Sequence, residues 1–153
     1  MTWSLVISLA VCWLATPAWA IDYDKRILIG QDFSGQNLTD SSFDKANLRD
    51  SNFSNANLQG VRFFAANLES TNLSGANLSY AILDSARLTR ANLTNAVLEG
   101  AFATSAKFEG ATIDGADFTD VLLRRDTEAA LCKIATGINP TTGRKTRDTL
   151  YCP

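Results

Sequence analysis

Residues 66–98 read ANLES TNLSG ANLSY AILDS ARLTR ANLTN AVL, and the pattern in this stretch decides the fold. A large apolar residue recurs at every fifth position, and the residue two places before it is small. Stepping by five in both directions extends this series from Leu28 to Leu123 without an insertion. Of these twenty positions, which we call the centres, nineteen hold Leu, Phe or Ile, and only Ala103 does not. The chain is therefore a tandem repeat of five residues.

A period of five fits neither an α-helix nor a long β-strand. Around a helix, an apolar residue at every fifth position would rotate by about 140° per step and form no buried face. The order small, polar, large does match the two-residue period of a strand, but only over three residues. The chain must therefore turn after each short extended piece. A coil of four such sides keeps the centres and small residues inside, and coils stacked at about 4.8 Å pair residues twenty positions apart.

The A-N-L pentads, of which Ala46-Asn47-Leu48 is one, resemble those of the pentapeptide-repeat family. The resemblance covers about residues 27–125. It implies an all-β solenoid, a right-handed quadrilateral parallel β-helix with four pentads per coil. Twenty pentads then make about five coils. The asparagines that precede many centres are expected to serve backbone and ladder hydrogen bonds rather than a ligand.

Residues 1–20 have the pattern of a signal peptide. The stretch 5–14 is apolar and uncharged, and Ala18-Trp19-Ala20 forms an A-x-A cleavage site. The apolar stretch is too short to span a bilayer comfortably. No basic residue precedes it, so a buried N-terminal helix is the alternative. We expect export, cleavage, and no stable membrane insertion of the chain that remains.

The remaining chain gives little sign of a charged or metal-binding partner. The net charge is −2, and the sequence contains no histidine. Beyond the predicted signal peptide there are two cysteines, Cys132 and Cys152. An even pair of cysteines in an exported protein indicates one disulfide.

A helix is predicted directly after the last pentad. Asp126 or Thr127 suits its N-terminus, because a side-chain oxygen at that position accepts a hydrogen bond from a free N–H of the first turn. Apolar residues recur at helical spacing from Leu131 to Ile138, and Gly137 is expected to end the helix.

A second resemblance concerns the end of the chain. The segment from Leu131 to Cys152, with NPTTG at residues 139–143, is similar to the tail of lumenal pentapeptide-repeat proteins of cyanobacteria and chloroplasts. It implies a thylakoid lumen or a periplasm as the location, and a helical cap in which the two cysteines are bonded. We therefore assign residues 21–125 to the β-helix and residues 126–153 to a disulfide-linked cap.

No catalytic or ligand-binding motif stands out from the repeat. Triads and metal sites that use histidine are excluded, because the chain has none. Acidic pairs such as Asp114 and Asp117 lie at outward repeat positions, where nothing in the sequence predicts a cleft. There is no phosphate-binding loop and no aromatic and basic stripe for nucleic acid. The sequence predicts no enzyme and no cofactor.

The predicted function is therefore a non-catalytic structural or protein-interaction module that binds through the outer faces of the β-helix. It would be a monomer or a weak dimer, and its protein partner is unknown. The alternative is a DNA-mimicking inhibitor of a topoisomerase, which some pentapeptide-repeat proteins are. That role requires a densely acidic surface, and a net charge of −2 argues against it.

One outer face breaks the polar pattern. Its exposed positions hold Phe64, Ile82, Phe102 and Leu122, which we call the contact patch. An exposed apolar patch on a soluble protein usually marks a contact. We expect the tail of the chain to fold back, so that it sets Leu131, Ile134 and Leu150 over Phe102 and Leu122 and covers the open end of the last coil. The alternative is a partner that docks on this face. Phe64, two coils away, is the better candidate for a partner or dimer contact.

Overall fold

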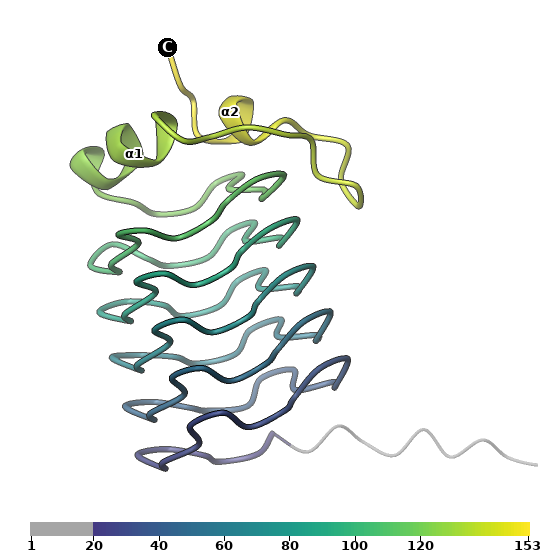
Figure 1. Cartoon of the computed structure of the whole chain (residues 1–153), viewed down its shortest axis with the longest axis vertical. Helices are drawn as coiled ribbons and strands as arrows, with labels where there is room; N and C mark the ends of the chain where they lie inside the picture. The colour runs from purple at the N-terminus through teal and green to yellow at the C-terminus, as the bar shows by residue number, and fades with distance from the viewer. Residues whose placement is uncertain (1–19) are drawn as a thin grey trace, which may run out of the picture.

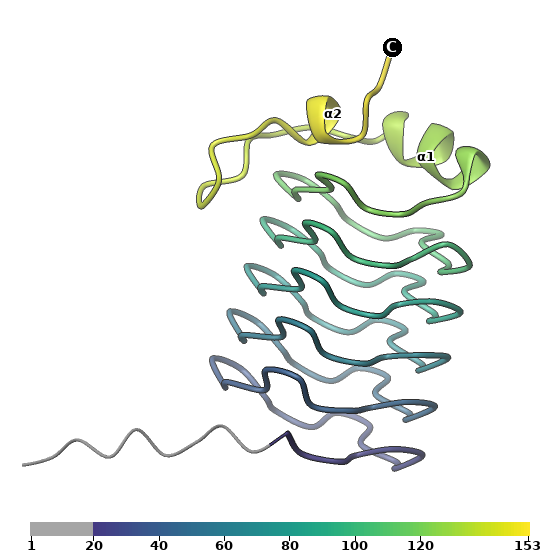
Figure 2. The same ribbon diagram turned by 180° about the vertical axis from the view of Figure 1, so that it is seen from behind.

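The computed structural model describes residues 20–153 as a rod of stacked rectangular coils (Figure 1). The first described residues lie at one end of the rod, and both helices lie across the other end (Figure 2). The predicted signal peptide lies outside the described residues, apart from Ala20. The rod therefore places the two ends of the described chain at opposite ends of the molecule.

Parallel β-bridges hold the coils together. Seventeen of them join residues twenty positions apart, from Asp22 with Ser42 to Phe102 with Leu122. Each pentad contributes one bridged residue, the one before its centre, and residues 20–153 contain no longer strand. The N–H of each centre from Tyr23 to Ala103 donates to a carbonyl of the next coil, as in the 2.6 Å bond from Leu78 to Val97. The register of twenty residues confirms the stacking that the repeat predicts.

Each corner of a coil is a tight turn. The N–H three residues after a centre donates to the carbonyl of that centre, as from Ala76 to Leu73 at 3.1 Å. The residue two places after most centres adopts a positive φ, which glycine tolerates best. Asn, Asp and Ser occupy many of these corners, but Ala65 and Tyr80 also adopt φ of 54° and 59°. The stacking of the coils therefore imposes the left-handed backbone conformation even on residues that disfavour it.

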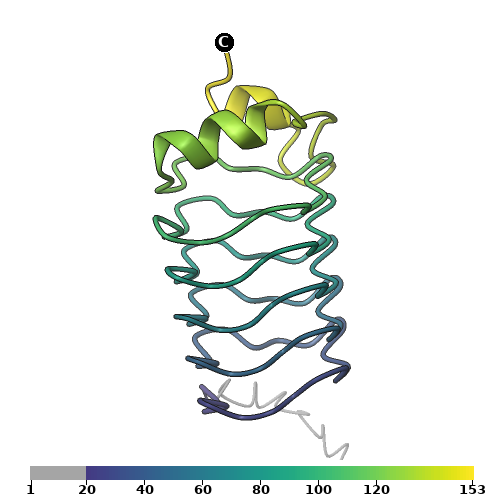
Figure 3. The ribbon, with the colours of Figure 1, turned by 60° about the vertical axis from the view of Figure 1, so that its left-hand side comes forward.

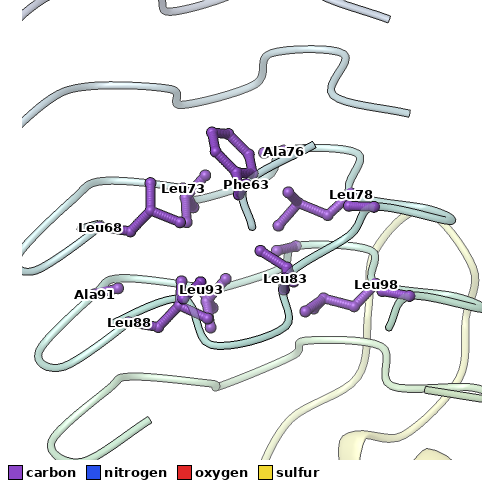
Figure 4. Close-up of a cluster of buried hydrophobic side chains, with 14 of the residues drawn as sticks. Phe63, Leu68, Leu73, Ala76, Leu78, Leu83, Leu88, Ala91, Leu93 and Leu98 are labelled. Carbon is purple, nitrogen blue, oxygen red and sulfur yellow. The ribbon is translucent and has the colours of Figure 1, made fainter. Parts of the chain in front are cut away.

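The centres fill the interior of the rod. Leu58, Leu78 and Leu98 are fully buried in successive coils, and Figure 4 shows Leu78 and Leu98 in this column. The coils nearest the N-terminus use aromatic rings instead, such as Phe33 and Phe53, whose centroids lie 4.7 Å apart. The predicted inner ladders are therefore present.

The repeat begins one pentad before Leu28. Tyr23 occupies a centre, and its ring stacks on that of Phe43 at 4.6 Å. The repeat of Leu, Phe and Ile does not predict this centre, because a tyrosine occupies it at the open end of the first coil. Tyr23 is partly buried there and packs against the hydrophobic core.

Two short helices follow the coils. Helix α1 is Arg125–Cys132, and helix α2 is Thr146–Thr149. The predicted start of the first helix at Asp126 or Thr127 is wrong, because extended Arg124 precedes it and no side chain caps it.

The predicted end of the first helix at Gly137 is also wrong, because α1 stops at Cys132. Gly137 serves a different purpose, since it packs against the corner of the last coil. A Cβ atom on Gly137 would lie 2.7 Å from the backbone nitrogen of Gly115, and its φ is +82°. A close approach of two backbones therefore requires this glycine.

Shortening a stacked centre should destabilise the rod. Leu78→Ala removes buried methyl groups from a side chain with no exposed surface, so we expect a loss of about 2–5 kcal/mol in the free energy of unfolding. The matched control is Ile27→Ala on an outer position that is 79% exposed, for which about 0.5 kcal/mol or less is expected. Denaturant unfolding measures both. Equal losses in the two variants would contradict the stacked core.

Candidate functional site

The tail closes the end of the last coil. Leu131, Ala135 and Leu150 are buried and join the hydrophobic core there. Figure 3 shows α1 lying across this end of the rod rather than along a side. The expected closure of the open end by the tail is confirmed, whereas the expected docking on Phe102 and Leu122 is wrong, since these side chains remain 44% and 53% exposed. The reason is that the open end exposes a whole cross-section of the core, which the tail buries first.

A buried asparagine anchors the tail to one corner of the rod. The Nδ2 group of Asn139 donates to the carbonyls of Asn95, Ala96 and Gly115, at 3.2, 3.2 and 2.9 Å. Its Oδ1 accepts the N–H groups of Thr141 and Thr142, at 2.9 and 3.0 Å. The side chain is fully buried, and its amide thus meets polar groups of both the coils and the tail.

An arginine forms a second attachment of the tail. Arg144 donates from Nε to Asp117 at 2.7 Å, and from its terminal nitrogen to Glu99 at 2.5 Å. Asp117 occupies the outward repeat position predicted for it, but its side chain has no exposed surface because Arg144 of the tail covers it. Burial alone would raise the pKa of Asp117, but hydrogen bonds from Thr119, Thr142 and Arg144 outweigh it and lower the pKa. Asp117 therefore stays ionised and holds the arginine.

The two cysteines that the sequence pairs are bonded. Cys132 ends α1 and Cys152 lies at the end of the chain, with their Cα atoms 5.5 Å apart. Arg147 donates to the carbonyls of Cys132 and Pro153, both at 3.0 Å. The disulfide therefore fixes the end of the tail to α1.

The contact patch is a stripe along one face of the rod. Ile82, Phe102 and Leu122 are joined by successive β-bridges, so they stack at the spacing of the coils. Phe64 lies in the neighbouring column and is 40% exposed, whereas Ile82 is half-buried. The structure thus brings the four predicted residues to one face.

An ion pair lies at each end of this stripe. Arg62 pairs with Asp44 at the end next to Ile82, and Arg124 pairs with Asp126 at 2.8 Å at the end next to Leu122. The apolar stripe is therefore a bounded surface between charged groups, which is the arrangement of an apolar centre with a polar rim.

The polar residues of the outer faces serve the backbone. Oδ1 of Asn52 and of Asn72 accepts the N–H two residues on, at 3.0 and 3.1 Å, and this confirms the predicted structural role of such asparagines. The side-chain ladder itself is weak, since the amides of Asn72 and Asn92 are 3.5 Å apart. On the face of the contact patch, Asp44 instead accepts the N–H of Phe64, one coil away, at 3.0 Å.

The described residues offer no obvious chemistry for catalysis. Within residues 20–153, no three His, Cys, Asp or Glu side chains gather to hold a metal ion. Backbone hydrogen bonds, from Ser34 and Thr127 respectively, lower the pKa of Asp32 and of Asp126. Neither carboxylate is therefore poised to donate a proton near neutral pH. No helix in the same part of the chain is long and apolar enough to cross a membrane.

Comparison with known proteins identifies the family. The model of the pentapeptide repeat region matches residues 36–118. The chain belongs to the pentapeptide-repeat family. Members of this family form right-handed quadrilateral β-helices, in agreement with the bridges and corners described above.

Solved pentapeptide-repeat structures show the same fold. A crystal structure from the Arabidopsis thaliana thylakoid lumen is 49% identical, with a TM-score of 0.84, over 85% of this chain and 90% of that one. HetL, a protein involved in heterocyst differentiation regulation in the cyanobacterium Nostoc, is 31% identical with a TM-score of 0.50. That alignment covers 62% of this chain and 44% of HetL.

A curated relative points to the same compartment. Thylakoid lumenal 15 kDa protein 1 of Arabidopsis thaliana is 65% identical over 37 residues, which are 24% of this chain. The match spans only 16% of the length of that relative. This pentapeptide-repeat protein is therefore related to proteins of the thylakoid lumen.

Removing the disulfide should loosen the cap before the coils. In Cys132→Ser/Cys152→Ser, the closed loop of twenty residues is lost, so we expect about 3 kcal/mol less stability for the cap. Hydrogen exchange should become faster at Leu150 while Leu78 stays protected. Mass spectrometry of the unreduced wild type should find the two cysteine peptides linked. Free thiols at both positions, or simultaneous opening of cap and coils, would contradict this.

The attachment through Arg144 should fail only in strong acid. The pKa of Asp117 is lowered on folding, so its contribution to stability is complete above the unfolded pKa of about 3.9 and is lost as the pH falls through the folded value. Hydrogen exchange of the cap should therefore change little between pH 7 and pH 5. If the cap already opens between pH 7 and pH 5, the pKa of Asp117 is not lowered on folding, and this prediction is wrong.

Removing the positive charge of Arg144 tests the same ion pair with Asp117. Arg144→Gln should destabilise the cap by about 1–3 kcal/mol at pH 7, because it removes a donor from a buried carboxylate. Arg49→Gln, in an exposed pair with Asp50, should change stability by less than about 1 kcal/mol. The difference between wild type and Arg144→Gln should shrink once Asp117 is protonated.

Proposed function

We propose that this pentapeptide-repeat protein is a non-catalytic structural or protein-interaction module of the thylakoid lumen. It is a rod of about five coils, closed by a disulfide-linked helical cap, and it binds a protein through an outer face. The contact patch is the observation that carries the proposal. Phe64, Phe102 and Leu122 each keep at least 40% of their surface exposed although the chain has a core and a cap in which to bury apolar groups.

The rigidity of the rod supports this role. The stripe Ile82, Phe102 and Leu122 is held by backbone bridges between coils, so its side chains are presented without an ordering step. Preorganised apolar and aromatic side chains surrounded by charged groups are typical of the energetic centres of protein interfaces. A partner with a complementary apolar ridge fits this surface.

The location rests on the relatives. A pentapeptide-repeat protein of the Arabidopsis thylakoid lumen aligns over most of the chain, and the predicted signal peptide and the disulfide both suit an exported protein. A periplasm is the alternative compartment. Fractionation of the native cells, with detection of the disulfide-linked form, separates the two.

The DNA-mimicking alternative predicts a different surface. It needs acidic groups repeated along the rod, and the outer columns instead mix charges, as in the pairs Arg62 with Asp44 and Arg90 with Glu69. Inhibition of DNA supercoiling by the purified protein would favour that alternative over the proposal.

Altering the contact patch should remove partner binding without unfolding the protein. We expect Phe102→Ser to reduce cross-linking of the tagged protein to its lumenal partner at least tenfold, since an exposed aromatic anchor is lost. Tyr80→Ser is the matched control, because Tyr80 is 55% exposed and lies outside the patch. Quantitative mass spectrometry of cross-linked lumen measures both. Unchanged capture by Phe102→Ser would refute the patch as the binding surface.

A further inference from the structure

The last coil has no coil beyond it, and the tail covers its edge unequally. On two sides, groups of the tail accept N–H hydrogen bonds that a further coil would otherwise accept. The N–H of Gly115 donates to the carbonyl of Thr136 at 2.9 Å, and the N–H of Phe118 donates to Oγ1 of Thr149 at 3.0 Å. On the side formed by residues 106–110, the structure provides no such substitute.

Three backbone groups on that side have no hydrogen-bond partner among residues 20–153. They are the carbonyl of Ala106, the N–H of Phe108 and the N–H of Gly110. Their counterparts one coil below are all bonded, since Ala86 accepts from Lys107 at 3.0 Å and Leu88 donates to Lys107 at 2.7 Å. Ala106, Phe108 and Gly110 therefore form a free β-edge.

The coil below also shows what would satisfy this edge. Lys107 both donates its N–H and accepts at its carbonyl, and the carbonyl of Glu109 accepts the N–H of Arg90 at 2.9 Å. One extended segment therefore makes three hydrogen bonds, two through Lys107 and one through Glu109. An incoming peptide in the same register would bond to Ala106 and Phe108 with one residue and to Gly110 with the residue two places on.

A groove of about 660 Å³ runs between this edge and α1. Ala106 and Phe108 line it and retain 6% and 5% exposure, whereas the equivalent Ala86 and Leu88 have none. On the α1 side it is lined by Ala130, Leu131 and Ile134, and Ile134 is 49% exposed. Polar side chains, among them Asp126 and Thr127, line the rest of the groove. It thus combines apolar and polar side chains with directed backbone donors and an acceptor, as binding sites for extended peptides do.

We propose that this groove, the edge groove, binds an extended peptide of a partner protein by β-augmentation. The side chain that stacks over Phe108 is large and apolar, because it lies between that ring and Ile134. The residue before it lies over Lys107 and is acidic, and the residue after it lies over Glu109 and is basic. The residue at the corner, over Ala106, is small. This interaction does not depend on the contact patch.

Other occupants fit less well. The tail of the same chain is held elsewhere by Asn139, Arg144 and the disulfide. The first described residues lie at the opposite end of the rod (Figure 2). The first coil of a second copy would bring four sides against an end that α1 and α2 already cover (Figure 1). A single extended segment avoids that collision.

Hydrogen exchange of the free protein tests the edge itself. The amides of Phe108 and Gly110 should exchange at least a hundredfold faster than those of Leu88 and Arg90, which occupy the same positions one coil below and are bonded. Equal protection of the two pairs would mean that the edge is already satisfied, and would overturn the proposal.

The binding test uses the peptide acetyl-Ala-Asp-Leu-Lys-Ser-amide, titrated into the full chain and followed by amide chemical shifts. Binding should shift the amides of Phe108 and Gly110 and slow their exchange. Methylation of the aspartate nitrogen of the peptide removes its bond to Ala106 and should weaken binding about tenfold. Methylation of the lysine nitrogen is the control, since its counterpart N–H at Glu109 donates to no other coil.

Protein variants complete the test. Ala130→Arg places a long side chain in the groove and should weaken binding at least tenfold. Ala129→Arg adds the same charge on an exposed position of α1 outside the groove and should not change binding. The proposal is overturned if no shifts occur at 5 mM peptide, roughly the weakest affinity worth detecting. It is also overturned if both methylated peptides bind alike, or if concentration-dependent self-association produces the same shifts.

Discussion

The hydrogen bond from a centre to the coil that follows is the interaction on which the rest of the structure depends. A lone coil of twenty residues buries its centres only partly and leaves its backbone groups unpaired, whereas a stacked coil satisfies both needs at once. Leu78 illustrates this, because its side chain packs between those of Leu58 and Leu98 while its N–H reaches Val97. Stability thus comes from repetition, and every coil needs a neighbour on each side.

That dependence explains how far the sequence could predict the fold. The register follows from the five-residue period together with the four pentads per coil that the family resemblance implies, and these place residues such as Asn57 and Asn77 in one column. The cap obeys no period. Its position depends on contacts between residues far apart in the chain, such as Asn139 with Asn95, and propensity alone placed the helix boundaries incorrectly. Gly137 was predicted to end the helix because glycine with a positive φ is common there. Here the glycine is needed instead for the close approach of its backbone to that of Gly115.

The candidate site was predictable to a similar degree. The column arithmetic correctly brought Phe64, Ile82, Phe102 and Leu122 to one face, because it needed only the register. It could not show whether the tail, which was expected to close the open end, also reaches these side chains. The open cross-section of the core attracted Leu131 and Leu150, and the face stayed exposed. The burial of Asp117 was missed for the same reason, because the residue that covers it, Arg144, lies outside the repeat.

The faces and the end of such a rod differ in what they can recognise. On a face the backbone is fully used between coils, so a partner meets side chains only, and the outward residues are free to vary without disturbing the centres. At the end the backbone itself is available, and any segment that binds there must adopt the register of a coil. The cap of this chain covers most of the core but the backbone edge only in part. Short helices bury apolar surface without offering a full row of donors and acceptors. A solenoid closed by helices therefore retains main-chain bonding capacity wherever the capping segment crosses an edge without running along it, and the side formed by residues 106–110 is where that happens here.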